Sequence, residues 1–563
     1  MSIIQFKEAN CKSCYQCIRH CAVKAISFHD EQARIMEDAC VLCGKCTLVC
    51  HQNAKQIDSD VPKIKEFLQS GAKVFVSVAP SYVSAYPGAS FSQLSAALKK
   101  LGFAHVEETA IGATRVSEEF TRLIEEHKMK NIITTCCPTI VMLVEKYYPE
   151  LIPCLAPVVS PAVAHAKMMR KLYGSRIKVV FLGPCISKKQ EAAQSGSIQA
   201  VLMFEELKHW MEEEGIAFDE EDPEPEEMHK TLARLYPVPG GILKTIPKEA
   251  RRNYKTISLD GLTRCMEILD SIRDNNIEGY LLEMSSCEGS CVEGPGMQHI
   301  KTPFLVAKDK ILANTRKKTM TKPVMSEDVT DDLRAVYNHT KVHDKIPDEA
   351  TIKEILAKIG KTTPESMLNC GTCGYPTCRD KAIAVYQGKA DLKMCLPYLR
   401  EKAESMSNVI LETTPNGLIM LDQDFLILQY NRAAGEILGL TPECVGMPIE
   451  MYLDGADFEK VRQGSGDIMG SRSVSANGKT VENSIVAVSN GDYLVVSKDI
   501  TAEEENRREM EEFRRETIET TQQVIDKQMR VAQEIASLLG ETTGETKAAL
   551  LKLKKSIAED KKL

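Results

Sequence analysis

The segment KVFVSVAPS (residues 73–81) decides the fold of the central part of the chain. It is typical of a short, buried, β-branched strand that ends in small and polar residues. Two later segments have the same form, NIITTCCP (131–138) and KVVFLGPC (178–185). Because amphipathic helical stretches such as 93–101 and 115–126 lie between them, we predict an α/β domain with largely parallel strands. Sheets of this kind carry their sites at the carboxyl ends of the strands, where this chain has cysteines and small polar residues.

Three loops of this central part resemble the signature loops of the [FeFe]-hydrogenase family. They are TTCCP (134–138), GPCISKKQE (183–191) and EMSSCEGSC (283–291), and they follow one another in the family's order. The resemblance implies an H-cluster, which is a [4Fe-4S] cubane joined through one cysteine sulfur to a diiron unit with CO, cyanide and a bridging dithiolate amine. It also implies that H2 and protons are the substrates.

The resemblance gives five cysteines a role in this cofactor. Cys137, Cys185, Cys287 and Cys291 match the four cubane ligands, and Cys291 matches the one that bridges to the diiron unit. Cys136 matches the free thiol that exchanges protons with the bridging amine. A thiol with an ordinary pKa of about 8.5 is a plausible proton relay near neutral pH.

Other residues match the walls of the cofactor pocket. Lys188 matches the residue that hydrogen-bonds a cyanide, where a buried ammonium makes a charge-assisted bond. Glu191 matches the carboxylate that closes the second loop and orients its lysines. The remaining cofactor-binding positions are Ala79, Pro80 and Ser81, which match the loop of the cyanide pocket, together with Gly183, Pro184 and Ser285.

The chain departs from catalytic members of the family at several positions. Gly183 and Ser285 stand where such members commonly carry methionine, which predicts a roomier and more polar pocket. The family's relay serine, twenty residues after the thiol, matches Ala156, and the relay carboxylate falls at Phe120 or Leu123 unless a one-residue gap restores a neighbouring Glu. Since proton delivery to a buried cluster needs a chain of groups within hydrogen-bond reach, we expect low turnover.

The N-terminal segment, residues 1–58, carries a doubled cysteine pattern. CKSCYQCIRHC (11–21) and CVLCGKCTLVC (40–50) share the spacing of bacterial two-cluster ferredoxins, in which the fourth cysteine of each run serves the other cluster. Structural zinc is the alternative. We predict an electron relay of α+β fold with two [4Fe-4S] clusters, one held by Cys11, Cys14, Cys17 and Cys50 and the other by Cys21, Cys40, Cys43 and Cys46.

A second cluster module is predicted at about 345–402. Its four thiolates are Cys370, Cys373, Cys378 and Cys395, and glycines in the loop NCGTCGYPTC (369–378) allow the chain to wrap a cubane. The set resembles the small [4Fe-4S] domains of redox chains, and a zinc knuckle is the alternative. Its position between the H-cluster domain (60–320) and the next module suggests that electrons or conformational signals pass that way.

Residues 405–503 resemble a PAS domain, a sensory or dimerisation module of α+β fold. The phrase YNRAAGEILG (430–439) carries the best match. No histidine occurs between 404 and 503, which excludes axial histidine ligation of a haem, and the PAS ligand is unknown. A purely structural dimerisation unit is the alternative. The predicted elements are strands at 415–422 and 425–430, a helix at 431–439, and strands at 471–475, 480–488 and 493–499.

The tail, residues 504–563, is predicted to be a signalling helix. Met510, Thr517, Val524, Val531 and Leu538 recur every seven residues, but Lys527 in the partner seam makes this a marginal coiled coil. We expect a homodimer through the PAS domain and this coil. No kinase or phosphatase segment follows, so we expect a separate kinase or phosphatase as output partner.

Composition limits the remaining function classes. The 563 residues carry a formal charge of −8, which argues against nucleic-acid binding, and no apolar run long enough for a membrane span is present. The N-terminus lacks the apolar region of a secretory signal, so we expect a cytoplasmic protein. In that compartment twenty cysteines are more plausibly metal ligands than disulfides.

Together these observations predict a multidomain α/β protein that is an H2-sensing [FeFe] hydrogenase of low turnover. It would cleave H2 reversibly and relay its redox state through iron–sulfur clusters to the PAS and coil modules. One alternative is a catalytic hydrogenase linked to ferredoxin or NADH partners. The other is a hydrogenase-like iron–sulfur scaffold protein without the diiron site.

Overall fold

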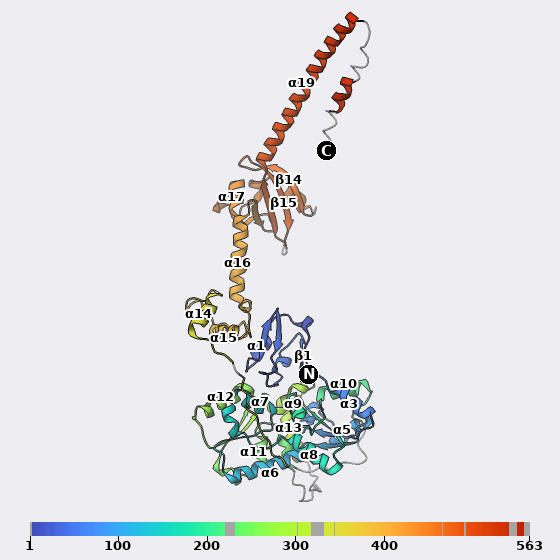
Figure 1. Cartoon of the computed structure of the whole chain (residues 1–563), viewed down its shortest axis with the longest axis vertical. Helices are drawn as coiled ribbons and strands as arrows, with labels where there is room; N and C mark the ends of the chain where they lie inside the picture. The colour runs from blue at the N-terminus through green and yellow to red at the C-terminus, as the bar shows by residue number, and fades with distance from the viewer. Residues whose placement is uncertain are drawn as a thin grey trace. The chain divides into compact units, whose positions relative to one another are not determined.

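The computed structural model describes residues 3–219, 231–300, 302–316, 332–342, 344–463, 466–488, 491–539 and 549–556. The chain divides into two compact units, Met1–Tyr398 and Leu399–Leu563 (Figure 1). The first three predicted modules thus fold together as one unit. The ends of the predicted H-cluster domain (317–320) and parts of the tail (540–548 and 557–563) lie outside the described residues. Within the described ranges, no helix is both long enough and apolar enough to cross a membrane.

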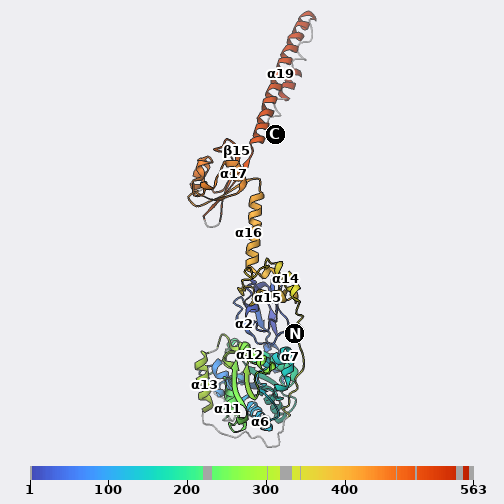
Figure 2. The same ribbon diagram turned by 90° about the vertical axis from the view of Figure 1, so that its left-hand side faces the viewer.

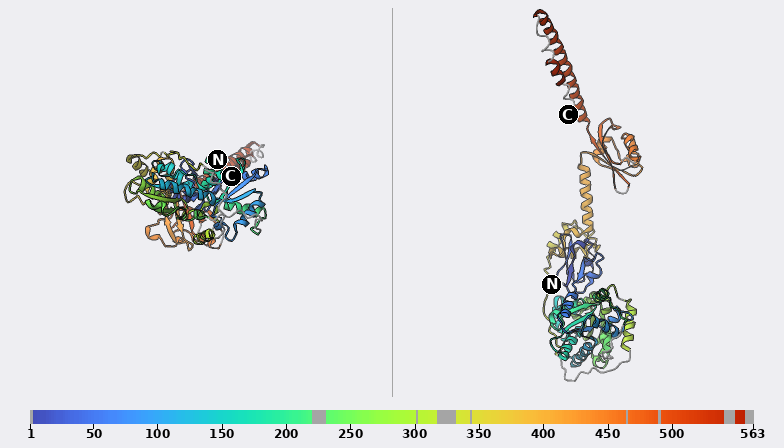
Figure 3. Two further views of the ribbon diagram at one scale, coloured as in Figure 1. Left: turned by 90° about the horizontal axis from the view of Figure 1, so that it is seen from below. Right: turned by 90° about the vertical axis from the view of Figure 1, so that its right-hand side faces the viewer.

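The N-terminal module consists of two small antiparallel ribbons and two short helices (Figure 3, dark blue). Strand β1 (Ile4–Phe6) pairs with β4 (Lys55–Ile57), and β2 (Ile26–His29) pairs with β3 (Gln32–Ile35). Helices α1 (Gln16–His20) and α2 (Lys45–Leu48) each carry the third cysteine of a run and begin after a left-handed residue, Tyr15 or Gly44. Each cysteine loop therefore turns sharply into its helix.

The central domain contains two separate parallel sheets. The first has the order β6-β5-β8-β9, and the second has the order β10-β11-β7. All five residues of the β5 segment VFVSV are buried, as expected for a parallel strand with helices on both faces. The strands are β5 (Val74–Val78), β6 (His105–Glu108), β7 (Ile132–Ile133), β8 (Lys178–Gly183), β9 (Ala200–Met203), β10 (Lys255–Asp260) and β11 (Tyr280–Ser285).

The prediction of parallel strands is confirmed, but their grouping is a finding of the structure. The predicted strands at 73–78 and 178–182 lie side by side in the first sheet, whereas that at 131–135 shortens to β7 at the edge of the second. Strand periodicity identifies a buried strand but not its partner, so the division into two sheets could not be predicted from it.

Helices cover both sheets of the central domain (Figure 1). Helices α6 and α8 pack closely against each other, because a Cβ atom at Gly112 would lie 2.5 Å from the Pro161 carbonyl oxygen and 2.6 Å from the His165 nitrogen. The helices are α3 (Val61–Gln69), α4 (Tyr82–Ala85), α5 (Phe91–Lys100), α6 (Ala110–Glu126), α7 (Pro138–Tyr147), α8 (Pro161–Tyr173), α9 (Ser187–Ser195), α10 (Phe204–Glu213), α11 (Gly241–Thr245), α12 (Leu262–Arg273) and α13 (Phe304–Arg316).

The second cysteine module packs against the N-terminal module (Figure 2). It contains α14 (Glu349–Ala357) and α15 (Cys378–Tyr386), and α16 (Leu396–Thr413) begins directly after it. Tyr375 and Met394 share an apolar core with Ile18 of α1. Gly374, at a φ of +93°, lies against the same Ile18, where a Cβ atom would come within 2.8 Å of its side chain.

The second unit has the strand order β13-β12-β16-β15-β14 in one antiparallel sheet. The Asn431 side chain caps α17 by accepting a hydrogen bond from the Ala434 amide, as a helix start requires. The elements are β12 (Gly417–Leu421), β13 (Ile427–Tyr430), α17 (Arg432–Leu438), α18 (Gly455–Arg462), β14 (Ile468–Val474), β15 (Thr480–Ala487), β16 (Tyr493–Asp499) and α19 (Thr501–Leu539). The predicted order of two strands, helices and three antiparallel strands is thus confirmed.

Candidate functional site

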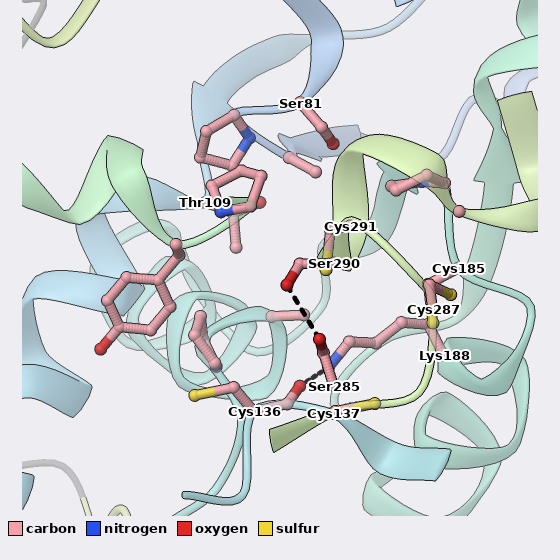
Figure 4. Close-up of a pocket in the computed structure, with 18 of the residues that line it drawn as sticks. Ser81, Thr109, Cys136, Cys137, Cys185, Lys188, Ser285, Cys287, Ser290 and Cys291 are labelled. Carbon is pink, nitrogen blue, oxygen red and sulfur yellow. Dashed lines mark hydrogen bonds between the residues drawn. The ribbon is translucent and has the colours of Figure 1, made fainter. Parts of the chain in front are cut away.

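A cavity of about 110 Å³ lies where the carboxyl ends of strands from both sheets meet (Figure 4). From the first sheet, β5 leads into Ala79, Pro80 and Ser81, and β8 leads to Pro184 and Cys185. From the second sheet, β7 is followed by Cys136 and Cys137, and β11 runs into Ser285 and Cys287. Two sheets rather than one therefore deliver the three signature loops to a single site.

Four cysteine sulfurs gather on one side of this cavity. They belong to Cys137, Cys185, Cys287 and Cys291, all of which line it (Figure 4). Burial and then repulsion by the neighbouring thiolates raise the pKa of Cys185, Cys287 and Cys291 above the ordinary thiol value. Thiolates that line one side of a cavity repel one another unless a cationic metal cluster lies between them, so this donor set fits an iron–sulfur cubane.

The Cys136 side chain points away from the other four sulfurs (Figure 4). It lines the same cavity and also contacts the apolar cluster around Phe120 and Ala156. Burial raises the pKa of the Cys136 thiol well above its ordinary value, and the nearby Lys188 ammonium opposes that rise. Cys136 is therefore a neutral thiol that faces the part of the cavity away from the four-sulfur group.

Lys188 on α9 is held by a small polar network. Its Nζ donates to Glu191 Oε2 at 2.7 Å, to Ser160 Oγ at 2.7 Å and to the Cys136 carbonyl oxygen at 3.4 Å. Ser160 Oγ in turn donates to Glu191 Oε2 at 2.8 Å. Burial alone would lower the pKa of Lys188, but the Glu191 carboxylate outweighs it and raises this pKa. The cavity thus keeps a positive charge in its wall.

Ser81 supplies a test of whether a diiron unit fits the remaining space. Its Oγ is fully buried, lines the cavity and has no hydrogen-bond partner within the protein (Figure 4). An unpaired buried hydroxyl is costly unless a ligand completes it. A free hydroxyl and an ammonium in the cavity wall fit anionic acceptors such as cyanide ligands.

The two positions that depart from catalytic relatives behave differently. Ser285 Oγ lies 2.8 Å from Ser290 Oγ in the cavity wall, so that side is polar as predicted. Gly183 does not line the cavity, whereas the Phe181 side chain does. A Cβ atom at Gly183 would lie 2.6 Å from the Phe181 ring. The Phe181 ring thus fills the space that we expected to be open beside Gly183. Phe181 lies just before the signature loop 183–191 and is not part of it.

Sequence reasoning missed several other residues of the wall. Thr109, Tyr236 and Glu283 all line the cavity. Glu283 lay inside a quoted motif, and its carboxylate accepts hydrogen bonds from the Gly240 and Leu243 amides at 2.7 and 3.0 Å. No local pattern marks the other two, which enter from segments far away in the sequence.

A tyrosine stands close to the position where the family has its relay serine. Ala156 is fully buried and has no hydroxyl. The Tyr337 hydroxyl donates to the carbonyl oxygens of Ala156 and Val158 at 2.8 and 3.1 Å, and Thr135 Oγ1 donates to the same two oxygens at 3.2 and 2.7 Å. These hydroxyl protons are held by backbone carbonyls rather than directed at the cavity.

Electrostatic interactions link members of the two N-terminal cysteine runs, Cys17 with Cys50 and Cys21 with Cys43. Burial raises the pKa of Cys17, and Cys14 and Cys50 raise it further. Burial likewise raises the pKa of Cys46, with added repulsion from the thiols of its own run and from Cys21. Cys21, whose pKa rises to about 12, is raised by burial and then by Cys43. Among the described residues, no three such side chains stand close enough to hold a single metal ion.

The four cysteines of the second module also share one neighbourhood. Burial lowers the pKa of Lys381, and Cys395, Cys373 and Cys378 all act on it in the opposite direction. Burial raises the pKa of Cys373, to which Cys395 and Cys370 add. Cys370, by contrast, is exposed, and a hydrogen bond from Thr372 lowers its pKa.

These cysteine groups lie in sequence from the cavity outward. Gly44 precedes α2 of the N-terminal module and lies against Pro295 and Ile186, neighbours of two cavity loops. Beyond it, Lys24 Nζ donates to the carbonyl oxygens of Ile18 and Gly374 at 3.0 and 2.9 Å. Burial lowers the pKa of Lys24, and Cys21 and Cys373 both oppose that shift. The groups are therefore in contact through protein rather than separated by solvent.

Comparison with protein families decides what this central domain is. The family of iron-only hydrogenase large subunits, C-terminal domain, matches residues 72–295. This part of the chain is an [FeFe]-hydrogenase domain. An Fe–S cluster family matches residues 367–397, and the PAS domain family matches residues 406–470. The chain thus combines segments similar to an iron-only hydrogenase domain, an Fe–S cluster domain and a PAS domain.

Individual relatives are distant. The periplasmic [Fe] hydrogenase large subunit of Nitratidesulfovibrio vulgaris is 26% identical over 380 residues, which cover 55% of this chain and 89% of that protein. Iron hydrogenase 1 of Clostridium pasteurianum is 24% identical, and the match covers 43% of this chain and 53% of that protein. A cytosolic Fe–S cluster assembly factor of Yarrowia lipolytica is 25% identical over 29% of this chain and 38% of its own. The apo [FeFe]-hydrogenase of Chlamydomonas reinhardtii is 17% identical, over 51% of this chain and 100% of that one, with a TM-score of 0.40.

Proposed function

We propose that this protein is an H2-sensing [FeFe] hydrogenase of low turnover. The observation that carries the proposal is the cavity itself, where four sulfurs gather on one side and Cys136, Lys188 and an unpaired Ser81 hydroxyl also line the wall. When bound, an H-cluster supplies the heterolytic cleavage of H2 into protons and electrons.

The residues of the chain would share the work as follows. The four cysteines would hold the cubane, with Cys291 as the ligand nearest the diiron unit. Lys188 and Ser81 would donate hydrogen bonds to its cyanide ligands, and Glu191 with Ser160 holds the ammonium in place. Cys136 would hold a proton at Sγ and serve as the proton donor and acceptor of the cavity.

Electrons would leave through the cysteine groups that adjoin one another. We propose one [4Fe-4S] cluster on Cys21, Cys40, Cys43 and Cys46, a second on Cys11, Cys14, Cys17 and Cys50, and a third on the four cysteines of the second module. The contacts at Gly44 and Lys24 support this order. A ferredoxin-like protein is the expected redox partner, and the reducing cytoplasm is the expected location.

The low-turnover part of the proposal rests on the interrupted thiol route at Ala156. The sensing part rests on the PAS domain, which, with α19, would form a homodimer and act on a separate kinase or phosphatase. Large apolar side chains on α19, including Phe513, Val524 and Val531, are exposed, which supports a partner helix there.

The direct test is to load the purified full chain with a synthetic diiron complex and record its infrared spectrum. CO and cyanide bands are expected, and C185A should lose them. C154A should keep them, because the half-buried Cys154 does not line the cavity. Absence of bands in the wild type would favour the scaffold alternative, to which the assembly-factor relative points. Turnover on the order of thousands per second would favour the catalytic alternative instead.

Sensing needs a second measurement on the same loaded protein. Limited proteolysis of the full chain under H2 and under argon should give different cleavage rates in the second unit. C185A should show no difference between the two gases. Equal cleavage in the loaded wild type would contradict a sensory role while leaving H2 chemistry intact.

A further inference from the structure

A continuous chain of hydrogen bonds leaves the cavity on the side of the first sheet. It starts at Thr109, which lines the cavity and precedes α6 (Figure 4). Thr109 Oγ1 lies 2.7 Å from Ser77 Oγ, and Ser77 Oγ lies 2.8 Å from His165 Nδ1. His165 Nε2 lies 2.8 Å from Glu107 Oε2. Each link is within ordinary hydrogen-bond distance.

The outer end of this chain reaches solvent. Glu107 Oε1 accepts a hydrogen bond from the Tyr173 hydroxyl at 2.7 Å and lies 2.8 Å from His105 Nε2. Tyr173 is 45% exposed, whereas Ser77 and His165 are 0% and 1% exposed. The chain therefore connects the cavity with the protein surface through an interior that excludes water.

The arrangement is built into the framework of the domain. Ser77 and Glu107 are paired residues on neighbouring parallel strands, so the sheet sets their separation. His165 comes from α8, which the missing side chain of Gly112 allows to lie directly on α6. Burying such polar groups costs free energy unless every member is bonded, and apolar residues would pack the same space without that cost. A role in packing alone does not explain them.

Charge at the outer end suits the release of protons. Burial alone would raise the pKa of Glu107, but hydrogen bonds from His105, His165 and Tyr173 outweigh it and hold this pKa far below its usual range. Glu107 therefore stays ionised and stabilises positive charge on His165, and a proton that reaches this carboxylate is released readily to solvent. Imidazole is suited to the step before it, because one ring nitrogen accepts a proton as the other releases one.

We propose that Thr109, Ser77, His165 and Glu107 form a proton relay between the cavity and solvent, an inference that rests on the proposed hydrogenase function. In the outward direction, Thr109 takes up a proton released in the cavity and passes its own to Ser77. Ser77 passes its proton to His165 Nδ1, and His165 releases the Nε2 proton to Glu107, which exchanges with solvent beside Tyr173. One proton moves, no bond between heavy atoms changes, and no electrons are transferred.

This relay is independent of the thiol route implied by the family resemblance. That route leads from Cys136 towards Ala156, where the nearby hydroxyls are held by backbone carbonyls. The proposed relay starts instead from the first sheet, on a different element, and contains a histidine and a carboxylate. It gives the cavity a proton exit where the sequence predicts an interrupted one.

The test compares matched variants of the diiron-loaded full chain in H2/D2O exchange. T109V keeps the shape of the side chain but removes the hydroxyl, and S77A cuts the next link. Both should slow HD formation by ~10-fold or more, a loss at the low end of proton-transfer effects. T109S, which restores the hydroxyl, should recover the rate. The infrared bands should be present in all variants, and those of S77A should match the wild type, because Ser77 does not line the cavity.

A second readout needs no diiron unit. In the histidine-labelled full chain, the 15N resonance of His165 Nδ1 should shift in S77A, because Ser77 is its hydrogen-bond partner. An unchanged resonance would show that the chain of bonds does not form and would overturn the relay. So would wild-type exchange rates in T109V and S77A with the bands present, an outcome that leaves the hydrogenase function standing. Absence of bands in the wild type would instead overturn both.

Discussion

At the scale of single residues, an unpaired hydroxyl is the most informative feature of the cavity. Ser81 Oγ makes no hydrogen bond within the protein, so S81A removes no protein contact and should change stability by less than about 1 kcal/mol. In the loaded protein, however, the variant should shift the cyanide bands of the infrared spectrum. S84A is the matched control, since Ser84 Oγ is also buried and unpaired but does not line the cavity. Identical spectra for S81A and wild type would remove Ser81 from the cofactor site.

The buried Glu107 carboxylate makes a prediction about stability and pH. Its pKa is held below the ordinary value of about 4.3, so the native state binds fewer protons than the unfolded chain in acid. Glu107 therefore contributes stability above about pH 4.3 that is lost as the pH falls through its lower native pKa. E107Q should be less stable than wild type by about 1–3 kcal/mol at pH 7, and the difference should shrink below pH 4. Chemical denaturation across this pH range measures it, and a constant difference would contradict the assignment.

At the scale of elements, a buried ion pair fixes the segment that brings Tyr236 to the cavity. Arg234 donates from Nε and Nη2 to the two carboxylate oxygens of Glu108 at 2.7 and 2.8 Å. Arg234 is 1% exposed, so R234M would leave a buried, unpaired carboxylate and should cost about 3–5 kcal/mol. The double variant R234M/E108L should recover most of that loss, because it removes both charges.

The control for the buried ion pair of Arg234 and Glu108 is an exposed set of ion pairs on α6. Arg122 bonds Glu119 and Glu126 on the surface of α6, and R122M should cost less than about 1 kcal/mol. Denaturation midpoints of the four proteins give the comparison. If R234M and R122M were equally mild, the pair would not fasten Leu232–Leu235 to β6.

At the scale of elements, the sequence predicts local structure but not the contacts between segments that are far apart in the chain. The twelve cysteines clustered at 11–50 and 370–395 and the order of strands and helices at 405–503 could be predicted from local sequence, whereas the roles of the three signature loops rest on a family resemblance. The division into two sheets, the filling of the Gly183 position by Phe181 and the entry of Tyr236 and Thr109 depend on contacts between distant segments. Periodicity reports whether a residue is buried, not what it is buried against.

The relay illustrates the same limit. Ser77 and Glu107 are unremarkable strand residues in the sequence, and His165 lies in a helix far along the chain. Strand pairing and the close approach of α8 at Gly112 bring them together. A functional chain of this kind becomes visible once the register of two strands and the packing of two helices are known.

At the scale of the whole molecule, the first unit contains three groups of cysteines: those of the cavity, of the N-terminal module and of the second cysteine module. The second cysteine module is fastened to the N-terminal module by backbone contacts as well as by side chains. The Phe28 amide donates to the Lys389 carbonyl oxygen at 2.9 Å, and Arg19 Nη2 donates to the Thr372 carbonyl oxygen at 3.1 Å. Electrons that reach the N-terminal clusters would thus have a second exit besides a soluble partner, and α16 begins directly after Cys395 of that exit.

Gly374 provides the test of this contact. A Cβ atom there would lie 2.8 Å from the Ile18 side chain, so G374A should push the module away from α1. G371A is the control in the same loop, because Gly371 also has a positive φ but its Cβ would meet nothing closer than the Tyr375 carbonyl oxygen at 3.9 Å. Both variants bear backbone strain of about 1 kcal/mol, so their difference reports the Ile18 contact.

The measurement is electron paramagnetic resonance of the reduced full chain. Neighbouring reduced clusters broaden each other's signals, and G374A should lose the broadening that involves the second module while G371A keeps it. Iron content must be the same in all three proteins, because a lost cluster would imitate a lost contact. Unchanged broadening in G374A at full iron content would mean that the Ile18 contact does not hold the module in place, and the electron exit towards α16 would then need another path.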